Sequence, residues 1–505
     1  MKSKEHLPHE TYAPVSLERL PSGVPGLDSI IGGGLVRGAS YLAMGRPGAG
    51  KTTFGNQLCF THVRRGERAV YVTLLAESHA SMVRNLQTFS FFEPGFLNRE
   101  LTYVGAYKTL RDDGLQGLLE LVRQVIQDEK ATLLVLDGIA PARAMAGSDV
   151  ALREFLIELQ SLGSMTNCTT LLLANLSGDE ANGPALTMVD GLFELAFERS
   201  QRRTLRTFEV VKFRGSGHLL GRQELVLNSG GLCVYPRTEE LLSSHSHPPE
   251  ASTRRLSTGI TVLDQLLGGG LLNGTASVIL GFTGSGKTTL ALHFLDAGAA
   301  TGDSSLYFGF YESPPRLLAA ADQVGLRLRK YEKTGHFAQI WQGSHEHCLD
   351  ALAGRLLHAV RTREVKRLVI DGLDGLRAAA LEQDRIMRYL TALTNELRAL
   401  DVTTLITDET TKARGPEIEL KVEGTSALAE NLILLEYLTL GTELRRMLSV
   451  VQQRTSAHNT ELREFRRTPH GMSIAEDVGG AEEIMSADGA ALEGRRNRRP
   501  RSGES

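Results

Sequence analysis

The chain has 505 residues, of which 41 % are hydrophobic and 23 % charged, and its formal net charge is −3. This length and composition suit two or three globular domains with buried cores, and the charge argues against a nucleic-acid-binding surface over the whole molecule. The N-terminal stretch lacks an apolar core of signal-peptide length, and no apolar run reaches about 18 residues, so we expect a cytoplasmic protein without membrane spans.

In chain order, short apolar segments alternate with helical ones. Apolar runs at residues 39–45, 68–75, 131–137 and 169–176 each predict a strand, and a helix is expected from Lys51. The second half repeats this order with runs at 276–281, 305–311, 367–372 and 403–409. Continuous apolar runs are typical of parallel strands that are buried on both faces. The pattern therefore predicts an α/β fold with a mostly parallel sheet flanked by helices.

The two halves of the chain are copies of each other. Residues 22–35 (SGVPGLDSIIGGGL) match residues 258–271 (TGITVLDQLLGGGL). The offset is 287 − 51 = 236 residues at two matching lysines and 371 − 137 = 234 residues at two matching aspartates. A period that holds across several landmarks indicates tandem copies of a whole domain.

Composition predicts where the copies begin and end. We expect an N-terminal extension over residues 1–16, domains over 17–238 and 256–477, and a Ser-, His- and Pro-rich linker over 239–255. Residues 478–505 are rich in Gly, Ala and Arg and are expected to form a disordered tail. The arginines of this tail could bind an acidic signalling partner, although a solvated tail is the simpler interpretation.

Each copy carries a glycine-rich loop between a predicted strand and a predicted helix: GRPGAGKTT at 45–53 and GFTGSGKTT at 281–289. The G-x-x-x-x-G-K-[ST] pattern in this context predicts a phosphate-binding loop, although a glycine-rich turn without a ligand is the alternative. Backbone N–H groups would surround the β-phosphate, the lysine would reach the β- and γ-phosphates, and the first threonine would hold Mg²⁺ with an aspartate that ends another strand. The residues expected to bind ATP are Gly45, Gly48, Gly50, Lys51, Thr52, Thr53, Gly281, Gly284, Gly286, Lys287, Thr288 and Thr289, and those expected to hold Mg²⁺ are Thr52, Asp137, Thr288 and Asp371.

Hydrolysis also requires a group that orients the attacking water. Glu77 and Glu312 each follow the second predicted strand of their copy, at the carboxyl edge of the sheet where nucleotides bind. A Glu-Ser pair before a helical run is also a helix start signal, so each glutamate could equally be a solvated residue there.

These motifs resemble the KaiC family of double-domain RecA-like ATPases. The resemblance rests on the GLDxxxGGGL entry, both phosphate loops, the strands that end in Glu-Ser and the stretch KFRGSGH at 212–218, and it covers about residues 17–477. It implies two tandem RecA-like P-loop NTPase domains in a homohexameric ring, with ATP bound between subunits. It also implies weak ATPase activity in the first domain and Ser/Thr autokinase activity in the second, in clock-related or other signalling.

The resemblance further implies a lysine and an arginine near the last hairpin that reach the neighbouring subunit's nucleotide. The first copy has both, as Lys212 and Arg214, whereas the second has Arg454 but Gln452 in place of the lysine. An arginine supplied in trans stabilises charge on a transferring phosphoryl group. Two exposed basic residues on a strand are the simpler alternative.

The chain departs from the family pattern at the catalytic glutamates. Where the family has two adjacent glutamates, this chain has Ala76-Glu77 and Tyr311-Glu312. Either the remaining glutamate of each pair takes over the role, or both sites bind ATP and turn it over slowly.

A second departure concerns the phosphorylated Ser-Thr pair of the family. Alignment of the following apolar strand places Ser426-Ala427 there, so a two-site cycle is not expected. Ser426 is a candidate phosphosite, with an ordinary loop hydroxyl as the alternative.

Two other functions compete with a KaiC-like ATPase. One is a nucleotide-gated scaffold without meaningful turnover. The other is a RecA-type DNA-handling motor, whose DNA-contacting loop should be basic. The corresponding loop at 177–191 has three acidic and no basic residues, and its counterpart at 408–424 has five acidic and three basic residues, so DNA handling ranks below the others.

Overall fold

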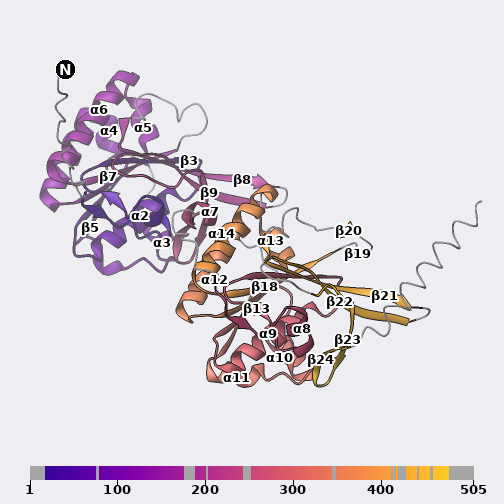
Figure 1. The fold of residues 1–505 in the computed structure, drawn as a ribbon. Helices are drawn as coiled ribbons and strands as arrows, with labels where there is room; N and C mark the ends of the chain where they lie inside the picture. The colour runs from indigo at the N-terminus through magenta and orange to yellow at the C-terminus, as the bar shows by residue number, and fades with distance from the viewer. Residues whose placement is uncertain are drawn as a thin grey trace, which may run out of the picture. The chain divides into compact units, whose positions relative to one another are not determined.

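The computed structural model divides into two compact units, residues 1–241 and 242–505, each built on a nine-stranded sheet flanked by helices (Figure 1). The described residues are 17–75, 79–175, 188–200, 203–242, 252–343, 348–380, 382–410, 413–414, 417–418, 428–440, 443–454 and 459–476. Two predicted site residues, Glu77 and Ser426, lie outside these ranges. No helix among the described residues is long and apolar enough to cross a membrane.

The first unit alternates strands and helices as its sequence predicts, and the helix expected from Lys51 begins at that residue. Its elements are β1 (Arg19–Leu20), α1 (Leu27–Ile30), β2 (Leu35–Val36), β3 (Ser40–Gly45), α2 (Lys51–Val63), β4 (Ala69–Thr73), α3 (His79–Leu86), η1 (Pro94–Phe96), β5 (Leu101–Gly105), α4 (Tyr107–Glu129), β6 (Leu133–Asp137), α5 (Ile139–Met145), α6 (Asp149–Thr166), β7 (Thr169–Asn175), β8 (Gly191–Ser200), β9 (Arg203–Phe213), β10 (Arg222–Asn228), β11 (Gly231–Tyr235) and α7 (Thr238–Leu242).

The sheet of the first unit has the strand order β11-β10-β9-β8-β3-β7-β6-β4-β5. The six strands from β8 to β5 are parallel, and β9, β10 and β11 continue the sheet in antiparallel pairs. The strand that leads into the phosphate loop, β3, is therefore central. All parallel strands end at one edge, which brings the ends of β3, β6 and β7 together.

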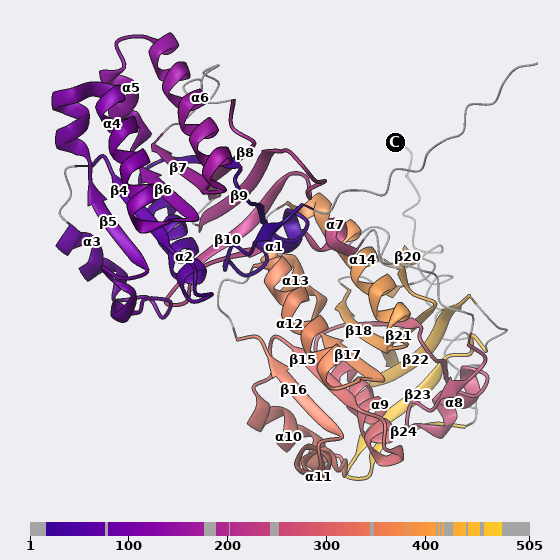
Figure 2. The same cartoon turned by 90° about the vertical axis from the view of Figure 1, so that its left-hand side faces the viewer.

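Side chains alternate across this sheet and form two cores. Tyr41 and Ala43 of β3 pack on the face covered by α2, whereas Leu42 and Met44 pack on the face covered by α4, α5 and α6 (Figure 2). Because both faces are covered, the strands are apolar along their whole length, which explains the continuous apolar runs in the sequence.

The second unit has the same alternation, and its described residues include a short hairpin, β19–β20, after β18. Its elements are β12 (Arg255–Leu256), α8 (Thr261–Leu266), β13 (Leu271–Leu272), β14 (Ala276–Gly281), α9 (Lys287–Thr301), β15 (Ser305–Gly309), α10 (Pro314–Gln323), α11 (Leu328–Thr334), β16 (Phe337–Trp341), α12 (Leu349–Thr362), β17 (Arg367–Asp371), α13 (Leu373–Ala379), η4 (Gln383–Arg385), α14 (Ile386–Ala399), β18 (Thr403–Glu409), β19 (Ala413–Arg414), β20 (Glu417–Ile418), β21 (Asn431–Leu440), β22 (Glu443–Gln453), β23 (Arg463–Thr468) and β24 (Gly471–Ile474).

The second sheet repeats the first strand by strand. Its order, β16-β15-β17-β18-β14-β21-β22-β23-β24, places β14 between β18 and β21, as β3 lies between β7 and β8. The predicted α/β fold with two tandem RecA-like domains is thus confirmed. The predicted domain boundaries stay a prediction, and we note that α7 extends to Leu242 and that β12 begins at Arg255.

Candidate nucleotide-binding sites

Both glycine-rich loops connect a central strand to the helix that follows it. Gly50 and Gly286 cap the N-termini of α2 and α9 with φ angles of 109° and 107°, a left-handed backbone that favours glycine. At the start of the first loop, a Cβ atom on Gly45 would lie 2.0 Å from the carbonyl oxygen of Leu195. The glycines of the motif therefore meet backbone requirements, and each loop opens onto a helix N-terminus, which favours phosphate groups.

The two loop lysines lie folded over their own loops. Lys51 Nζ donates to the carbonyl oxygens of Gly45 and Arg46 at 2.8 and 2.9 Å. Lys287 Nζ makes the matching bonds to the first two carbonyls of its loop, both at 2.9 Å. Burial lowers the pKa of Lys51, and the nearby charge of Asp137 opposes this shift. Each ammonium group thus lies over its own loop, where a bound phosphate would take the place of the carbonyl oxygens as hydrogen-bond acceptor.

A hydroxyl pair holds the predicted metal-binding aspartate of the first unit. Thr52 Oγ1 and Tyr71 Oη both donate to Asp137 Oδ2, at 3.2 and 2.6 Å. Hydroxyl and carboxylate oxygens are the ligands that Mg²⁺ takes, so Thr52 and Asp137 fit the role predicted for them. The tyrosine was missed by sequence reasoning, because an aromatic residue in an apolar strand gives no sign that its hydroxyl meets a carboxylate.

The second unit repeats this arrangement and extends it. Thr288 Oγ1 and Tyr307 Oη donate to Asp371 Oδ2 at 3.0 and 2.6 Å. Thr407 Oγ1 donates to the other carboxylate oxygen, Oδ1, at 2.5 Å. The residue of the first unit that corresponds to Thr407 is Leu173, which pairs with Asp137 in the same register and has no hydroxyl.

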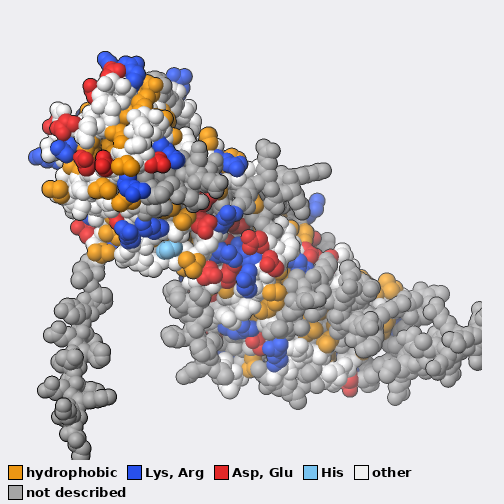
Figure 3. All heavy atoms as spheres, turned by 90° about the horizontal axis from the view of Figure 1, so that it is seen from above, with side chains coloured by type: hydrophobic (Ala, Val, Ile, Leu, Met, Phe, Trp, Pro, Cys, Tyr) orange, Lys and Arg blue, Asp and Glu red, His pale blue; other side chains and the backbone are white. Residues whose placement is uncertain are grey.

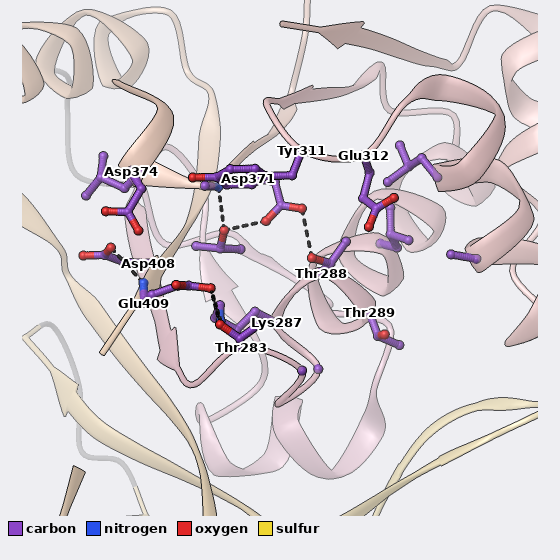
Figure 4. Close-up of a pocket in the computed structure, with 18 of the residues that line it drawn as sticks. Thr283, Lys287, Thr288, Thr289, Tyr311, Glu312, Asp371, Asp374, Asp408 and Glu409 are labelled. Atoms are coloured by element: carbon purple, nitrogen blue, oxygen red, sulfur yellow. Dashed lines mark hydrogen bonds and ion pairs between the residues drawn. The ribbon is translucent and has the colours of Figure 1, made fainter. Parts of the chain in front are cut away.

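A cavity of about 520 Å³ opens above the second phosphate loop. The predicted residues Lys287, Thr288, Glu312 and Asp371 all line it, together with Gly284, Gly286 and Thr289 (Figure 4). The structure therefore brings the predicted phosphate, metal and water-orienting groups of this copy into one place. Glu77 of the first copy cannot be compared, because it lies outside the described residues.

Three further carboxylates line this cavity: Asp374, Asp408 and Glu409. Glu409 Oε1 accepts a hydrogen bond from Thr283 Oγ1 at 2.8 Å and lies 3.9 Å from Lys287 Nζ. Sequence reasoning missed them, although a comparison of the copies holds the signal. β18 ends in Thr-Asp-Glu where β7 ends in Leu-Ala-Asn.

The predicted trans-acting residues lie at the other end of the sheet. Lys212 pairs with Leu192 near the start of β8, and its Nζ donates to the carbonyl oxygen of Val189 at 2.7 Å. Burial lowers the pKa of Lys212, and Arg214 adds to this shift. The Arg214 guanidinium is 61 % exposed and lies 3.6 Å from Asp190. The phosphate loop begins where β3 ends, so neither basic residue lies beside the loop of its own unit.

Gln452 takes the place of the lysine in the second unit. It pairs with Leu432 near the start of β21, and its Nε2 donates to the carbonyl oxygen of Ala429 at 3.3 Å. Glutamine thus satisfies the matching backbone group without a positive charge. The exposed Arg454 follows at the end of β22.

Two copies of a parallel sheet, each with a complete phosphate loop, a lysine and a hydroxyl–aspartate pair, define a double P-loop ATPase of the RecA-like class. The sequence model of the family described as "ATPase: KaiC" matches residues 20–239 and again residues 256–479. The chain therefore belongs to the KaiC family, as its sequence motifs predict.

Individual relatives cover nearly the whole chain. It is 25 % identical to "Circadian clock oscillator protein KaiC" of Parathermosynechococcus lividus, over 92 % of this chain and 87 % of the relative. It is 25 % identical to "Circadian clock protein KaiC3" of Synechocystis sp., over 93 % and 94 % of the two chains. It is 26 % identical to "Circadian clock protein KaiC2" of the same organism, over 94 % and 84 %.

Proposed function

We propose that this protein is a self-assembling, Mg²⁺-dependent ATPase in which the first unit hydrolyses ATP at a site completed by a second copy of the chain. The observation that carries the proposal is the separation of Lys51 from Arg214 in the first unit. Lys51 belongs to the loop at the carboxyl end of the parallel strands, whereas Arg214 follows β9 at their amino end.

The chemistry of ATP hydrolysis explains why this separation matters. The transition state gains charge on the γ-phosphoryl oxygens, and an arginine there contributes a large part of the rate. Arg214 is exposed and cannot lie at its own phosphate loop, because the sheet separates the two. A neighbouring copy of the chain can bring Arg214 to that loop, which makes assembly a condition for turnover.

A mixing experiment tests this proposal. ADP release is measured for the wild type, for Lys51→Ala and for Arg214→Ala, with Mg²⁺ and ATP. Each variant alone should lose most of the activity. An equimolar mixture should regain a fraction of it, because some interfaces then combine an intact loop with an intact arginine. Arg222→Ala, at another exposed arginine of the same sheet, is the control and should behave as the wild type.

The mixture also has outcomes that contradict the proposal. Activity in Arg214→Ala equal to the wild type would remove the arginine from the mechanism. If both variants lose ATPase activity and the mixture does not recover it, the catalytic site would be formed within one chain. The mass of the assembly with ATP, measured by light scattering, should correspond to a closed ring, and the family resemblance implies six copies.

For the second unit we propose Mg²⁺-dependent nucleotide binding and Ser/Thr autokinase activity on Ser426. The support is the complete loop, the hydroxyl–aspartate pair and Glu312 at the same cavity. Incubation with γ-labelled ATP followed by phosphosite mapping should place label on Ser426 and remove it in Ser426→Ala. Absence of label from the wild-type protein would refute the kinase role.

Two alternatives remain, of which the first is distinguished by the same measurement of ADP release and the second by the charges on the surface. A nucleotide-gated scaffold would bind ATP but release ADP at the background rate in the wild type and in Glu77→Gln alike. A DNA-handling motor would need a basic track, but basic and acidic side chains intermingle on the face drawn in Figure 3. The arginines of residues 478–505 are our proposed contact for an acidic signalling partner.

A further inference from the structure

The second phosphate loop is bridged by a hydrogen bond that the first loop cannot form. Thr283, the third residue of the loop, donates to Glu409 at the end of β18 at 2.8 Å. The matching residues of the first unit are Pro47, which has no donor, and Asn175, which has no charge. The match is set by the sheets, because Gly281 pairs with Glu409 in the same register as Gly45 with Asn175.

The position of this hydrogen bond within the cavity suggests how it affects a bound nucleotide. The loop lysine reaches the β- and γ-phosphates of a bound nucleotide. Glu409 Oε1 lies 3.9 Å from Lys287 Nζ, so its carboxylate and the phosphates of a bound nucleotide would share this ammonium group. Figure 4 shows Glu409 beside Thr283 and Lys287, whereas Glu312 lies beyond Thr288.

The neighbouring carboxylates differ from Glu409 in their partners. Asp408 accepts two hydrogen bonds from Arg377, at 2.8 and 2.6 Å, and Asp374 accepts one from the same guanidinium at 2.6 Å. Their charge is thus offset inside the fold. The Glu409 carboxylate meets groups of the phosphate loop itself, the hydroxyl of Thr283 and the ammonium of Lys287.

We propose that Glu409 is a specificity-determining residue, which makes the second site favour ADP over ATP relative to the first site. ADP leaves the place of the third phosphate open, so the bond between Thr283 and Glu409 can persist. ATP brings further negative charge next to the carboxylate and competes with it for Lys287, in a cavity where charges interact more strongly than in water. This inference rests on the proposed nucleotide binding.

The single tryptophan of the chain allows the second site to be observed separately. Trp341 ends β16, and its Nε1 donates at 3.3 Å to the carbonyl oxygen of Phe310, which directly precedes the cavity residues Tyr311 and Glu312. Energy transfer from Trp341 to N-methylanthraniloyl-labelled ADP or ATP therefore reports binding at this site. The full chain is used with Lys51→Ala, which weakens binding at the first loop.

The measured quantity is the ratio of the ATP dissociation constant to the ADP dissociation constant, with Mg²⁺. Glu409→Gln keeps the acceptor for Thr283 and removes the charge. We expect it to lower the ratio at least about tenfold, mainly through tighter ATP binding, since a single close charge pair is worth more than this in a partly buried site. A ratio that stays within twofold of the parent value would overturn the proposal. If Glu409→Gln instead lowers only ATP turnover, the residue acts as a base.

A transfer experiment gives an independent check. The same pair is built on the first loop by combining Asn175→Glu with Pro47→Thr. The chain also carries Lys287→Ala, which weakens binding at the second loop. Calorimetry should then show a raised ATP-to-ADP ratio at the first loop, whereas Asn175→Gln with Pro47→Thr is the neutral control. An equal ratio in both transfers would contradict the role of the charge. A parent chain that binds neither nucleotide would instead refute the proposed function and is recognised by the absence of both signals.

Discussion

The buried hydroxyl of Tyr307 donates to Asp371 Oδ2 at 2.6 Å, the same oxygen that accepts the hydrogen bond of Thr288. The first unit repeats the contact between Tyr71 and Asp137 at the same distance. If Mg²⁺ binds as proposed, the threonine hydroxyl would serve the metal, and the tyrosine would continue to orient Oδ2 while Thr407 holds Oδ1. Groups that orient metal ligands in this way tune metal affinity.

Removal of this hydroxyl should lower the affinity for Mg²⁺ at the second site and so raise the Mg²⁺ requirement of nucleotide binding. We expect Tyr307→Phe to raise the Mg²⁺ concentration needed for half-maximal ATP binding by about tenfold, because Asp371 Oδ2 loses the hydrogen bond that orients it while only Oδ1 stays held by Thr407. Binding measured in EDTA should not change. Tyr389→Phe is the matched control, since Tyr389 Oη donates to the carbonyl oxygen of Leu349 elsewhere in the unit. An equal Mg²⁺ requirement in both variants would remove the positioning role.

A reciprocal exchange tests the difference between Lys212 and Gln452. Lys212→Gln should lower ADP release by about tenfold or more, because one cationic donor to the transferring phosphoryl group is lost. Gln452→Lys should raise turnover at the second site. The fold should tolerate both changes, because each side chain donates to the matching backbone carbonyl. Unaltered rates at unaltered melting temperatures would show that the residue at this position does not act on nucleotide.

The pair of Arg377 and Asp408 should be a large single contribution to the stability of the second unit. The Asp408 side chain is 0 % exposed, and removal of its partner leaves a buried charge. Arg377→Met should therefore lower the free energy of unfolding by about 3–5 kcal/mol, measured by urea titration. Lys366→Met breaks the exposed pair with Asp401 and should cost about 0–1 kcal/mol. Similar losses in the two variants would contradict the argument.

The second unit should become less stable as the pH is lowered, because of His293. Burial lowers its pKa to about 4 from 6.5, and its Nε2 accepts a hydrogen bond from the Met472 N–H group. Below pH 6.5 this histidine is protonated in the unfolded chain, whereas in the folded chain it stays neutral down to about pH 4. The free energy of unfolding therefore decreases as the pH is lowered from 6.5 to about 4.

Between pH 7 and pH 5 the expected loss from His293 is about 2 kcal/mol. His293→Gln keeps an acceptor for Met472 and should reduce the pH dependence of the urea midpoint by this amount. The exposed His470→Gln is the control and should retain the wild-type dependence. The same pH dependence of the urea midpoint in all three proteins would show that His293 is not the cause of the loss.

The sequence by itself determined the repeat, the fold class and both phosphate loops. These features are local, because a glycine at a left-handed φ, a lysine that begins a helix and a buried parallel strand each require a particular residue type at a fixed spacing. The aspartates were found for the same reason, as each ends an apolar run. Period and motif together were sufficient to predict the family.

Only the tertiary structure decided which further side chains meet at the two sites. Tyr71 and Tyr307 lie in apolar strands, and Glu409 ends one, so their roles depend on which strand lies beside which. The insertion of β18 between β14 and β17 places Glu409 against Thr283, 126 residues away in the chain. Sequence spacing carries no information about such neighbours, because strand order arises from the packing of the whole sheet.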